Sequence, residues 1–419
     1  MNNISSFKSG NYPTWLLIYV FVIYVIGWHI GFEITTVIVF AHIALEMLFM
    51  QNFTISKSFL LFLAPFLLIV SIGFIVGITQ VMFNIAHPMD FLRDLFYYLG
   101  PVIYAIFGYI LSRRYLCSLD KLFSFFFFLG VYLAIAHIIE MAFNIEFYLN
   151  SSGNINDRTK ITHFINISIL LMLAGFRFNS LNLKPSSVIL ILILMFSMYF
   201  SYSRVSIFVL LLFIVGLYGV NFFKIKRFSA AVILISISIA FLILDHSSLF
   251  LEKLYNSFSE LSKTKFLDDK DINHYWRSYE SIKAIESYFN DGGIFNHLFG
   301  YGFGKTSDLG ISIKLGDNHF TEIGVFHNAY ISFLLKTGVI GLFAYIFFSL
   351  YFVVQYFHVK VTNQDHIIKQ LIAICLLTLL FINFVISAVI QPKVGFVYFI
   401  FIGSLFFQLS IVTIKRINK

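Results

Sequence analysis

Residues 58–78 read SFLLFLAPFLLIVSIGFIVGI, a run of twenty-one residues without a single charged side chain. At 1.5 Å per residue, an α-helix of this length covers about 31 Å, which matches the hydrocarbon core of a bilayer. Lipid offers no hydrogen-bond partner to a polypeptide backbone, so a run of this kind crosses a membrane as a helix. This stretch therefore predicts a membrane-spanning helix.

Comparable apolar runs recur along the 419-residue chain, which is 59% hydrophobic and only 12% charged. With a mean hydropathy of +0.86, the composition excludes a water-soluble globule. We expect an all-α polytopic membrane protein with twelve spans. They are predicted at residues 14–30, 34–50, 58–78, 95–112, 122–143, 161–176, 186–202, 205–223, 228–244, 338–357, 369–388 and 395–413.

The distribution of Lys and Arg predicts the orientation of these spans. With the N-terminus inside, fifteen of these cations fall at cytoplasmic ends and loops, against five in the short loops on the other side. Such a bias follows the positive-inside rule, so both termini are expected in the cytoplasm. Most of the net charge of +8 is then a topological signal. The cytoplasmic loops are too short to form a basic face for nucleic acid.

The spans divide the chain into three parts. Residues 1–244 hold nine spans, residues 245–337 form a large polar loop on the outer side, and residues 338–419 hold three spans and a cytoplasmic tail. A loop of this length among short loops is typical of a functional segment. Within it, apolar residues at steps of three and four predict an amphipathic helix that Gly292 and Gly293 end. These apolar residues are Trp276, Tyr279, Ile282, Ile285 and Phe289.

Three further glycines in this loop, Gly300, Gly302 and Gly304, alternate with aromatic residues. Glycine-rich loops can hold phosphate, but this one lacks the spacing and the Lys-Ser/Thr ending of a P-loop. We therefore expect a flexible turn.

Two arginines stand out by position. Arg204 lies between two strongly apolar spans with almost no loop, and Arg277 lies on the predicted amphipathic helix. A snorkelling or solvated cation is the ordinary explanation for each. The functional alternative is that both guanidinium groups converge on one anion, and a diphosphate suits them because each can bind phosphate oxygens with two hydrogen bonds.

At the end of the polar loop, His327-Asn328 is followed after nine residues by Gly338-Val339-Ile340-Gly341, which we interpret as the start of a helix. An imidazole at the mouth of a membrane domain can act as a base on a substrate held at the bilayer surface. Zinc binding is not supported by any ligand spacing. The acidic group around Asp269-Lys270-Asp271 contains the minimal Asp-x-Asp of metal-dependent glycosyltransferases, but such clusters are usually solvated.

These features together resemble the superfamily of O-antigen polymerases (Wzy-type) and O-antigen ligases, bacterial inner-membrane glycosyltransferases of GT-C-like architecture. The layout of nearly the whole chain is similar, with one large periplasmic loop before the last three spans. Within it, a His followed by an amide or hydroxyl residue, nine residues and Gly-x-x-Gly is typical, as in His327, Asn328, Gly338 and Gly341. An Arg after a short periplasmic turn and an Arg opening an amphipathic helix are also typical, and Arg204 and Arg277 match them.

The resemblance implies a metal-independent, cofactor-independent and inverting transfer of glycan from undecaprenyl diphosphate. His327 would be the general base, and Arg204 and Arg277 would stabilise the charge on the diphosphate. Lipid-linked repeat units and the bilayer are the implied partners, together with a separate chain-length regulator as a family expectation. Further contacts to substrate are predicted for Asn328, Tyr330, His319, Tyr301, Arg158 and Lys160.

The motifs do not separate a polymerase, which extends a lipid-linked repeat unit, from a ligase, which transfers to lipid A–core. We favour a polymerase because residues 245–337 hold nine Lys and Arg against twelve Asp and Glu, a poor match to phosphorylated lipid A–core. A protein O-oligosaccharyltransferase is a smaller possibility. A twelve-span transporter or flippase stays open as a different class, although the chain shows no repeated halves.

Overall fold

The computed structural model describes residues 14–49, 54–143, 162–177, 185–200, 204–218, 266, 271–272, 275–290, 292–315, 318–357 and 364–417. In the described part, eleven apolar helices correspond to eleven of the predicted spans, and residues 228–244 lie outside it. The helices are α1 (Thr14–His29), α2 (Phe32–Phe49), α3 (Lys57–Met82), α4 (Pro88–Arg114), α5 (Leu119–Phe143), α8 (Thr162–Arg177), α9 (Pro185–Phe200), α10 (Arg204–Tyr218), α15 (Ala329–Phe357), α16 (Gln364–Ile382) and α17 (Pro392–Ile417).

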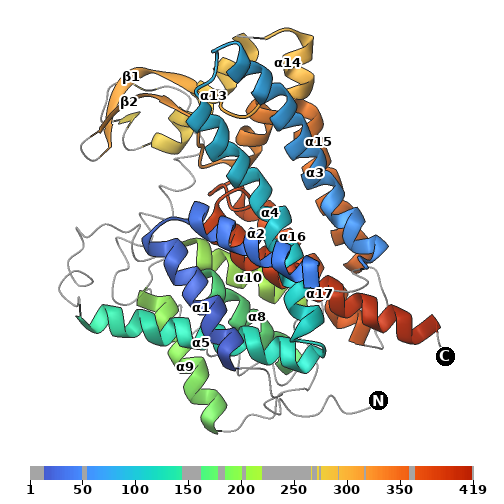
Figure 1. The fold of residues 1–419 in the computed structure, drawn as a ribbon. Helices are drawn as coiled ribbons and strands as arrows, with labels where there is room; N and C mark the ends of the chain where they lie inside the picture. Colours follow the sequence, from blue (N-terminus) through green and yellow to red (C-terminus); the bar gives the residue numbers. More distant parts are fainter. Residues whose placement is uncertain are drawn as a thin grey trace.

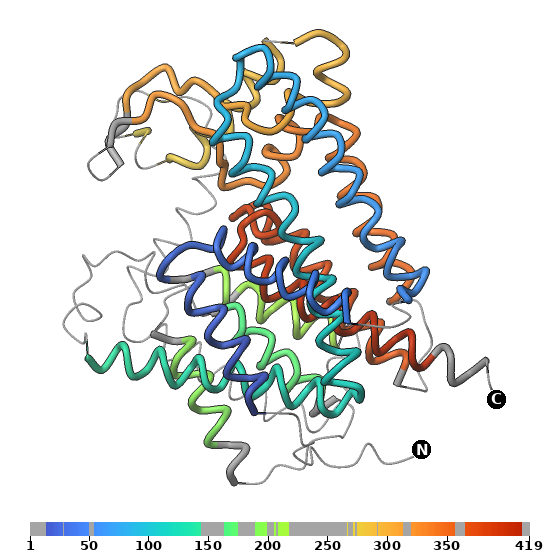
Figure 2. Tube along the Cα trace, viewed as in Figure 1, coloured from blue at the N-terminus to red at the C-terminus, as the bar shows by residue number. Residues whose placement is uncertain are grey.

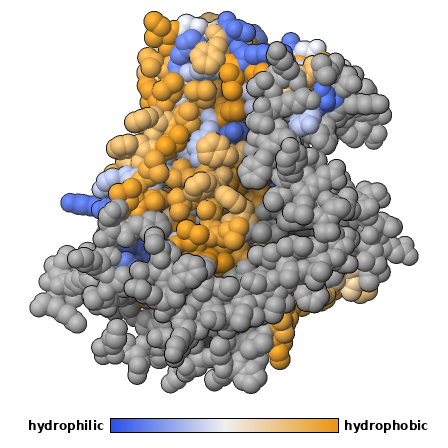
Figure 3. All heavy atoms as spheres, turned by 180° about the vertical axis from the view of Figure 1, so that it is seen from behind, coloured by the Kyte–Doolittle hydropathy of each residue, from blue (hydrophilic) through white to orange (hydrophobic). Residues whose placement is uncertain are grey.

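Seven of the described helices, namely α2, α3, α4, α5, α15, α16 and α17, are long and apolar enough to cross a membrane, and α1, α8, α9 and α10 are shorter apolar helices. The prediction of an all-α polytopic membrane protein is confirmed. Figure 3 shows an extended apolar surface on one side of the molecule, with hydrophilic side chains gathered towards one end. Exposed Leu and Phe side chains of α3 and α15, among them Leu67, Leu68, Phe343 and Phe347, suit contact with lipid.

The centre of the helical bundle is the contact between α4 and α17. Here two glycines let the backbones touch, because a Cβ atom at Gly108 would lie 2.0 Å from the carbonyl oxygen of Ile400, and one at Gly403 would lie 2.0 Å from that of Ala105. Ser404 donates a hydrogen bond of 2.8 Å to the Gly108 carbonyl across the same contact. Small residues and interhelical hydrogen bonds of this kind are typical of helix packing in membranes.

A polar cap covers one end of α3, α4 and α15 (Figures 1 and 2). It consists of α13 (Trp276–Asn290), α14 (Ile294–Phe299) and an antiparallel hairpin of β1 (Ser307–Leu315) and β2 (Asn318–Ile323). The helix was predicted, but its buried face differs from the predicted apolar stripe, because Glu280, Ala284 and Tyr288 are buried whereas Ile285 and Phe289 are exposed. The hairpin was not predicted. Its signal was the alternation of Leu309, Ile311, Ile313 and Leu315 before the turn-forming pair Gly316-Asp317, a pattern typical of hairpins.

The glycine-rich segment Gly300–Gly304, which we call the glycine strap, is packed between α3 and α15, so the expected flexible turn is wrong. Gly300, Gly302 and Gly304 have φ of 75°, 80° and 89°, a region that favours glycine. The Gly302 amide donates to the Lys336 carbonyl and the Phe303 amide to the Gly73 carbonyl, both at 2.9 Å. The strap thus fastens the cap to two helices through its backbone.

We expect Gly302→Ala to abolish correct folding, while Gly310→Ala is tolerated. Both glycines have positive φ, 80° and 68°, and a side chain in this region costs about 1–2 kcal/mol. Only at Gly302 would the added Cβ also collide with backbone, 2.2 Å from the Gly77 nitrogen, whereas nothing lies within 4 Å at Gly310. Thermal unfolding and gel filtration of the two detergent-solubilised variants check this. Equal behaviour would show that the strap is not packed as described.

Element α15 consists of two helices that meet at a kink at Gly338, and the predicted helix start coincides with this kink. Gly338 has φ 66° and ψ −169°, which separates a first helix, beginning at Ala329, from the predicted one that follows Gly338. A side chain there would meet the Leu298 carbonyl oxygen at 2.3 Å, so the interruption lets the end of α14 approach α15. The first helix was not predicted because the charge of Lys336 was assigned to the external loop, whereas the structure buries Lys336 within this helix.

Candidate active site

His327 and Glu280 form a tight pair at the junction of the cap and the helical bundle. The Glu280 carboxylate accepts a hydrogen bond of 2.6 Å from the backbone N–H of His327. Both carboxylate oxygens also lie 3.0 Å from Nδ1 of the His327 ring. The Glu280 side chain is 0% exposed and that of His327 is 41% exposed, so the carboxylate is buried behind an accessible imidazole.

This geometry determines which ring nitrogen carries the proton. An ionised carboxylate only accepts hydrogen bonds, so Nδ1 has to be the N–H donor to Glu280. In the neutral imidazole, Nε2 then keeps its lone pair and can take a proton. A carboxylate behind a histidine holds the ring in one tautomer and stabilises the imidazolium that forms, as in hydrolase triads. The arrangement is therefore suited to general base catalysis.

Packing on both sides of the pair explains its position. Next to His327, Phe326 is 1% exposed and belongs to a buried cluster with Ala284 and Tyr288 of α13 and Leu335 of α15. This cluster holds α13 against the start of α15, and α13 carries Glu280. After His327, the Asn328 side-chain oxygen accepts a hydrogen bond of 2.9 Å from the Tyr330 amide, so Asn328 caps α15.

Sequence reasoning missed Glu280 as the partner of His327. The two residues are 47 positions apart, and no local periodicity connects them. The available signal was the burial pattern of α13, since Glu280 shares a helix face with the apolar residue Ala284 and lies one turn after Arg277. A carboxylate on the face of an amphipathic helix that packs inward usually has a partner.

The other predicted arginines and basic residues are only partly described. Arg277 is half-buried on α13, and its carbonyl accepts a hydrogen bond of 2.6 Å from the Ser281 hydroxyl. Arg204 is the first residue of α10, but its side chain lies outside what the structure describes. Arg158 and Lys160 lie outside the described residues altogether. A convergence of Arg204 with Arg277 thus stays a prediction.

The three aromatic and imidazole residues that were predicted to contact substrate, Tyr301, Tyr330 and His319, lie in three different parts of the structure. Tyr301 is 5% exposed, and its hydroxyl donates a hydrogen bond of 3.1 Å to the Tyr288 carbonyl. The Tyr330 hydroxyl donates to the Leu380 carbonyl of α16, so it helps to anchor α15 in the bundle. His319 lies in β2 with Lys314 opposite, and its side chain is outside the description.

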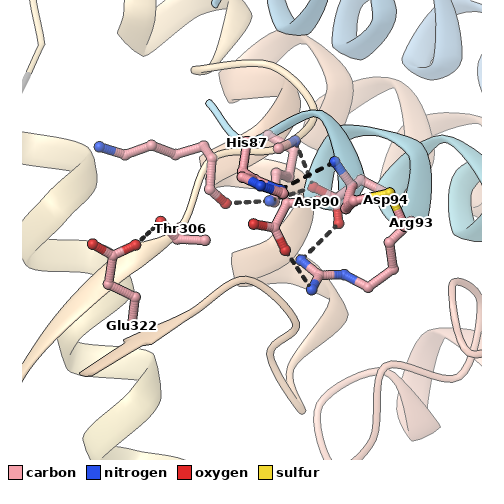
Figure 4. A network of polar contacts seen from close by, with 10 residues as sticks. His87, Asp90, Arg93, Asp94, Thr306 and Glu322 are labelled. Atoms are coloured by element: carbon pink, nitrogen blue, oxygen red, sulfur yellow. Dashed lines mark hydrogen bonds and ion pairs between the residues drawn. The ribbon is translucent and has the colours of Figure 1, made fainter. Parts of the chain in front are cut away.

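A buried charge network next to the strap was not predicted. Lys336 of α15, 1% exposed, lies 2.5 Å from a carboxylate oxygen of Asp94 on α4, which is 2% exposed. Asp94 also accepts a hydrogen bond of 2.8 Å from the Gly304 amide, and Lys336 donates to the Lys305 carbonyl. Arg93 pairs with Asp90 at 2.7 Å, as Figure 4 shows. The network ties α4, α15 and the strap together.

Among the described residues, no group of three or more His, Cys, Asp and Glu side chains is placed to hold a metal ion. Asp269 and Lys270 of the acidic sequence around the Asp-x-Asp lie outside the description. At His327 the structure brings together an imidazole and the carboxylate of Glu280, and Arg277 lies one helical turn before Glu280 on α13.

Comparison with protein families identifies the region that contains this site. Residues 188–346 match the family model described as O-antigen ligase. This match supports the assignment of the chain to the O-antigen polymerase and ligase superfamily. The matched residues include α13, the strap, the hairpin and the start of α15, and therefore Arg204, Arg277, Glu280 and His327. No curated protein sequence is significantly similar to the chain.

The match to the O-antigen ligase family model points to a glycosyltransferase-like enzyme of O-antigen assembly. The family is associated with bacterial membranes and with lipid-linked glycans, and the apolar helices agree with such an environment. The resemblance noted from the His327 motif and the two arginines is thereby confirmed at the level of the superfamily.

Proposed function

We propose that the chain is an O-antigen polymerase. It transfers the growing glycan from undecaprenyl diphosphate to a sugar hydroxyl at the non-reducing end of another lipid-linked repeat unit. The single observation that carries this proposal is the His327–Glu280 pair, in which a buried carboxylate orients an accessible imidazole within the matched part of the family. A sugar hydroxyl is a poor nucleophile at neutral pH, so a base of this kind is the group the reaction needs.

The proposed reaction is a single displacement at the anomeric carbon. Nε2 of His327 takes the proton of the acceptor hydroxyl while its oxygen forms the new glycosidic bond. The bond between the anomeric carbon and the diphosphate oxygen breaks, and the undecaprenyl diphosphate leaves with the electron pair. The anomeric configuration inverts, Glu280 stabilises the imidazolium, and the proton then passes to solvent.

Charge develops on the diphosphate as it leaves, and cations near it lower the barrier. Arg277 is proposed for this role because it lies one turn before Glu280 on α13 and is half-buried. Arg204 is proposed on the family resemblance alone. Diphosphate is a good leaving group once its charge is balanced, so the proposal includes neither a strong general acid nor a metal.

We infer that the polar cap faces the periplasm. The described helices then run so that the cytoplasmic ends carry Arg113, Arg114 and Lys369, in agreement with the positive-inside rule. In this orientation α13, the hairpin and His327 lie at the outer surface of the inner membrane, where lipid-linked glycans are exposed to them.

An O-antigen ligase is the second candidate, because the family model carries that description. A ligase would use the same base and the same donor but would take lipid A–core as acceptor. The excess of acidic over basic residues in the loop, twelve against nine, favours a polymerase.

Deletion of the gene that encodes this protein from its source strain distinguishes a polymerase from a ligase on a lipopolysaccharide gel. We expect core that bears a single repeat unit, with the ladder of longer chains lost and restored by the wild-type chain, because ligation continues without polymerisation. Bare core, with polymer retained on undecaprenyl diphosphate, would instead identify a ligase. An unchanged ladder would contradict both functions.

A further inference from the structure

A polar pocket lies in the cap along the part of α13 that follows Glu280. Its volume is about 370 Å³, within the range of roughly 300–1,000 Å³ typical of small-molecule sites. Residues of α13, the strap, both strands of the hairpin and the end of α3 line it. Neither His327 nor Glu280 belongs to its lining. The pocket is therefore a separate feature from the proposed catalytic pair.

The pocket is lined by cationic, anionic and uncharged polar side chains. Two amines, Lys283 and Lys305, face three carboxylates, Glu286, Asp308 and Glu322, and amide and hydroxyl groups lie between them. Lys283 lies 2.8 Å from Glu286, and this hydrogen bond raises the pKa of Lys283, so the amine is charged. The Thr306 hydroxyl donates to Glu322 at 2.5 Å, a contact that Figure 4 shows.

This mixture excludes several ligands. An isoprenoid tail would leave charged groups desolvated without partners, which is costly. A diphosphate would meet more carboxylates than amines. A sugar fits, because each hydroxyl both donates and accepts hydrogen bonds and so pairs with amines, amides and carboxylates in turn. Tyr301 forms part of one wall, with Lys305 Nζ 5.0 Å from the centre of its ring.

We propose that this pocket is a binding site for uncharged sugar residues of the glycan chain, separate from the reacting sugar. The inference rests on the proposed function and adds a substrate subsite to it. Ser287 in the pocket is seven residues after Glu280 on the same helix, a rise of about 10 Å. A glycan held in the pocket would extend along α13 towards His327 and present a sugar one or two units away to the base.

Two variants of α13 test the pocket with a matched control. Ser287→Trp places an indole in the pocket, and Ile285→Trp places the same group two residues away, at a side chain that is 38% exposed and does not line the pocket. The probe is lipid-free polysaccharide released by mild acid from lipopolysaccharide of the source strain. Its binding to the full-length protein in detergent is measured by calorimetry.

We expect Ser287→Trp to weaken binding at least about tenfold, the equivalent of one or two lost hydrogen bonds, and Ile285→Trp to bind like the wild type. If Ser287→Trp does not fold, the double variant Asn290→Ala and Glu322→Gln, which adds no bulk, carries the same expectation. Unchanged binding in a folded pocket variant, or no binding by the wild type, would overturn the proposal.

Failure of this inference is distinguishable from failure of the proposed function. His327→Asn protein should bind the polysaccharide like the wild type, because His327 does not line the pocket. Loss of transfer with retained binding supports both proposals. Normal transfer by His327→Asn would overturn the catalytic role without touching the pocket.

Discussion

Purified His327→Asn protein is expected to transfer glycan between lipid-linked repeat units about 10²–10⁴ times more slowly than the wild type, the usual contribution of a general base. Asparagine is chosen because its amide nitrogen can replace Nδ1 as the donor to Glu280. The backbone N–H of residue 327 also continues to donate to Glu280. The variant therefore keeps the buried carboxylate partnered and loses only Nε2.

Glu280→Gln is the companion variant for this prediction. A glutamine can accept the backbone N–H of His327 through its oxygen, but it then presents its NH₂ group to Nδ1. The ring would have to accept there and carry its proton on Nε2, which is the wrong tautomer for a base. We expect a large loss of turnover with little change in thermal stability. The measurement is the rate at which purified protein converts lipid-linked units into longer products on a gel.

Near wild-type turnover in folded His327→Asn protein would remove His327 as the base and return the transporter alternative to consideration. Loss of turnover in His327→Asn but not in Glu280→Gln would keep the base and dismiss the orienting role of the carboxylate. The two variants thus test separate parts of the pair.

The second large effect is expected at the buried ion pair of Lys336 and Asp94. Lys336→Met should lower the free energy of unfolding by about 3–5 kcal/mol, because it leaves a buried carboxylate without its cation. The remaining contacts of Asp94 are the Gly304 amide at 2.8 Å and an Arg93 nitrogen at 3.6 Å, which replace the amine only in part. Thermal unfolding in detergent would show a large decrease in midpoint.

Two controls sharpen this result. The double variant Lys336→Met and Asp94→Asn should recover most of the stability, because the asparagine oxygen still accepts from the Gly304 amide and no charge is left buried. Lys283→Met breaks a pair with the half-exposed Glu286 and should cost less than about 1 kcal/mol. Equal costs for Lys336→Met and Lys283→Met would refute the importance of the buried pair.

The buried pair of Lys336 and Asp94 could not be predicted from the sequence. A lysine in an apolar run is normally assigned to a loop, because a charge in the membrane is costly. The cost is lifted here by Asp94, which lies 242 residues away in the chain. Since no local pattern indicates a partner at that separation, the helix between Ala329 and the kink at Gly338 was predicted as part of the external loop.

The positions of eleven spans, the polar segment and the amphipathic helix followed from the sequence, because lipid and water impose local requirements on hydropathy and periodicity. The His327 motif and the position of Arg277 on the amphipathic helix could also be identified from the sequence, since both depend on local spacing. Tertiary structure alone decided which carboxylate orients His327, how the glycine strap packs against Gly77 and Lys336, and that the cap contains a polar pocket. These features depend on contacts between segments far apart in the chain, and such contacts produce no periodic pattern in the sequence.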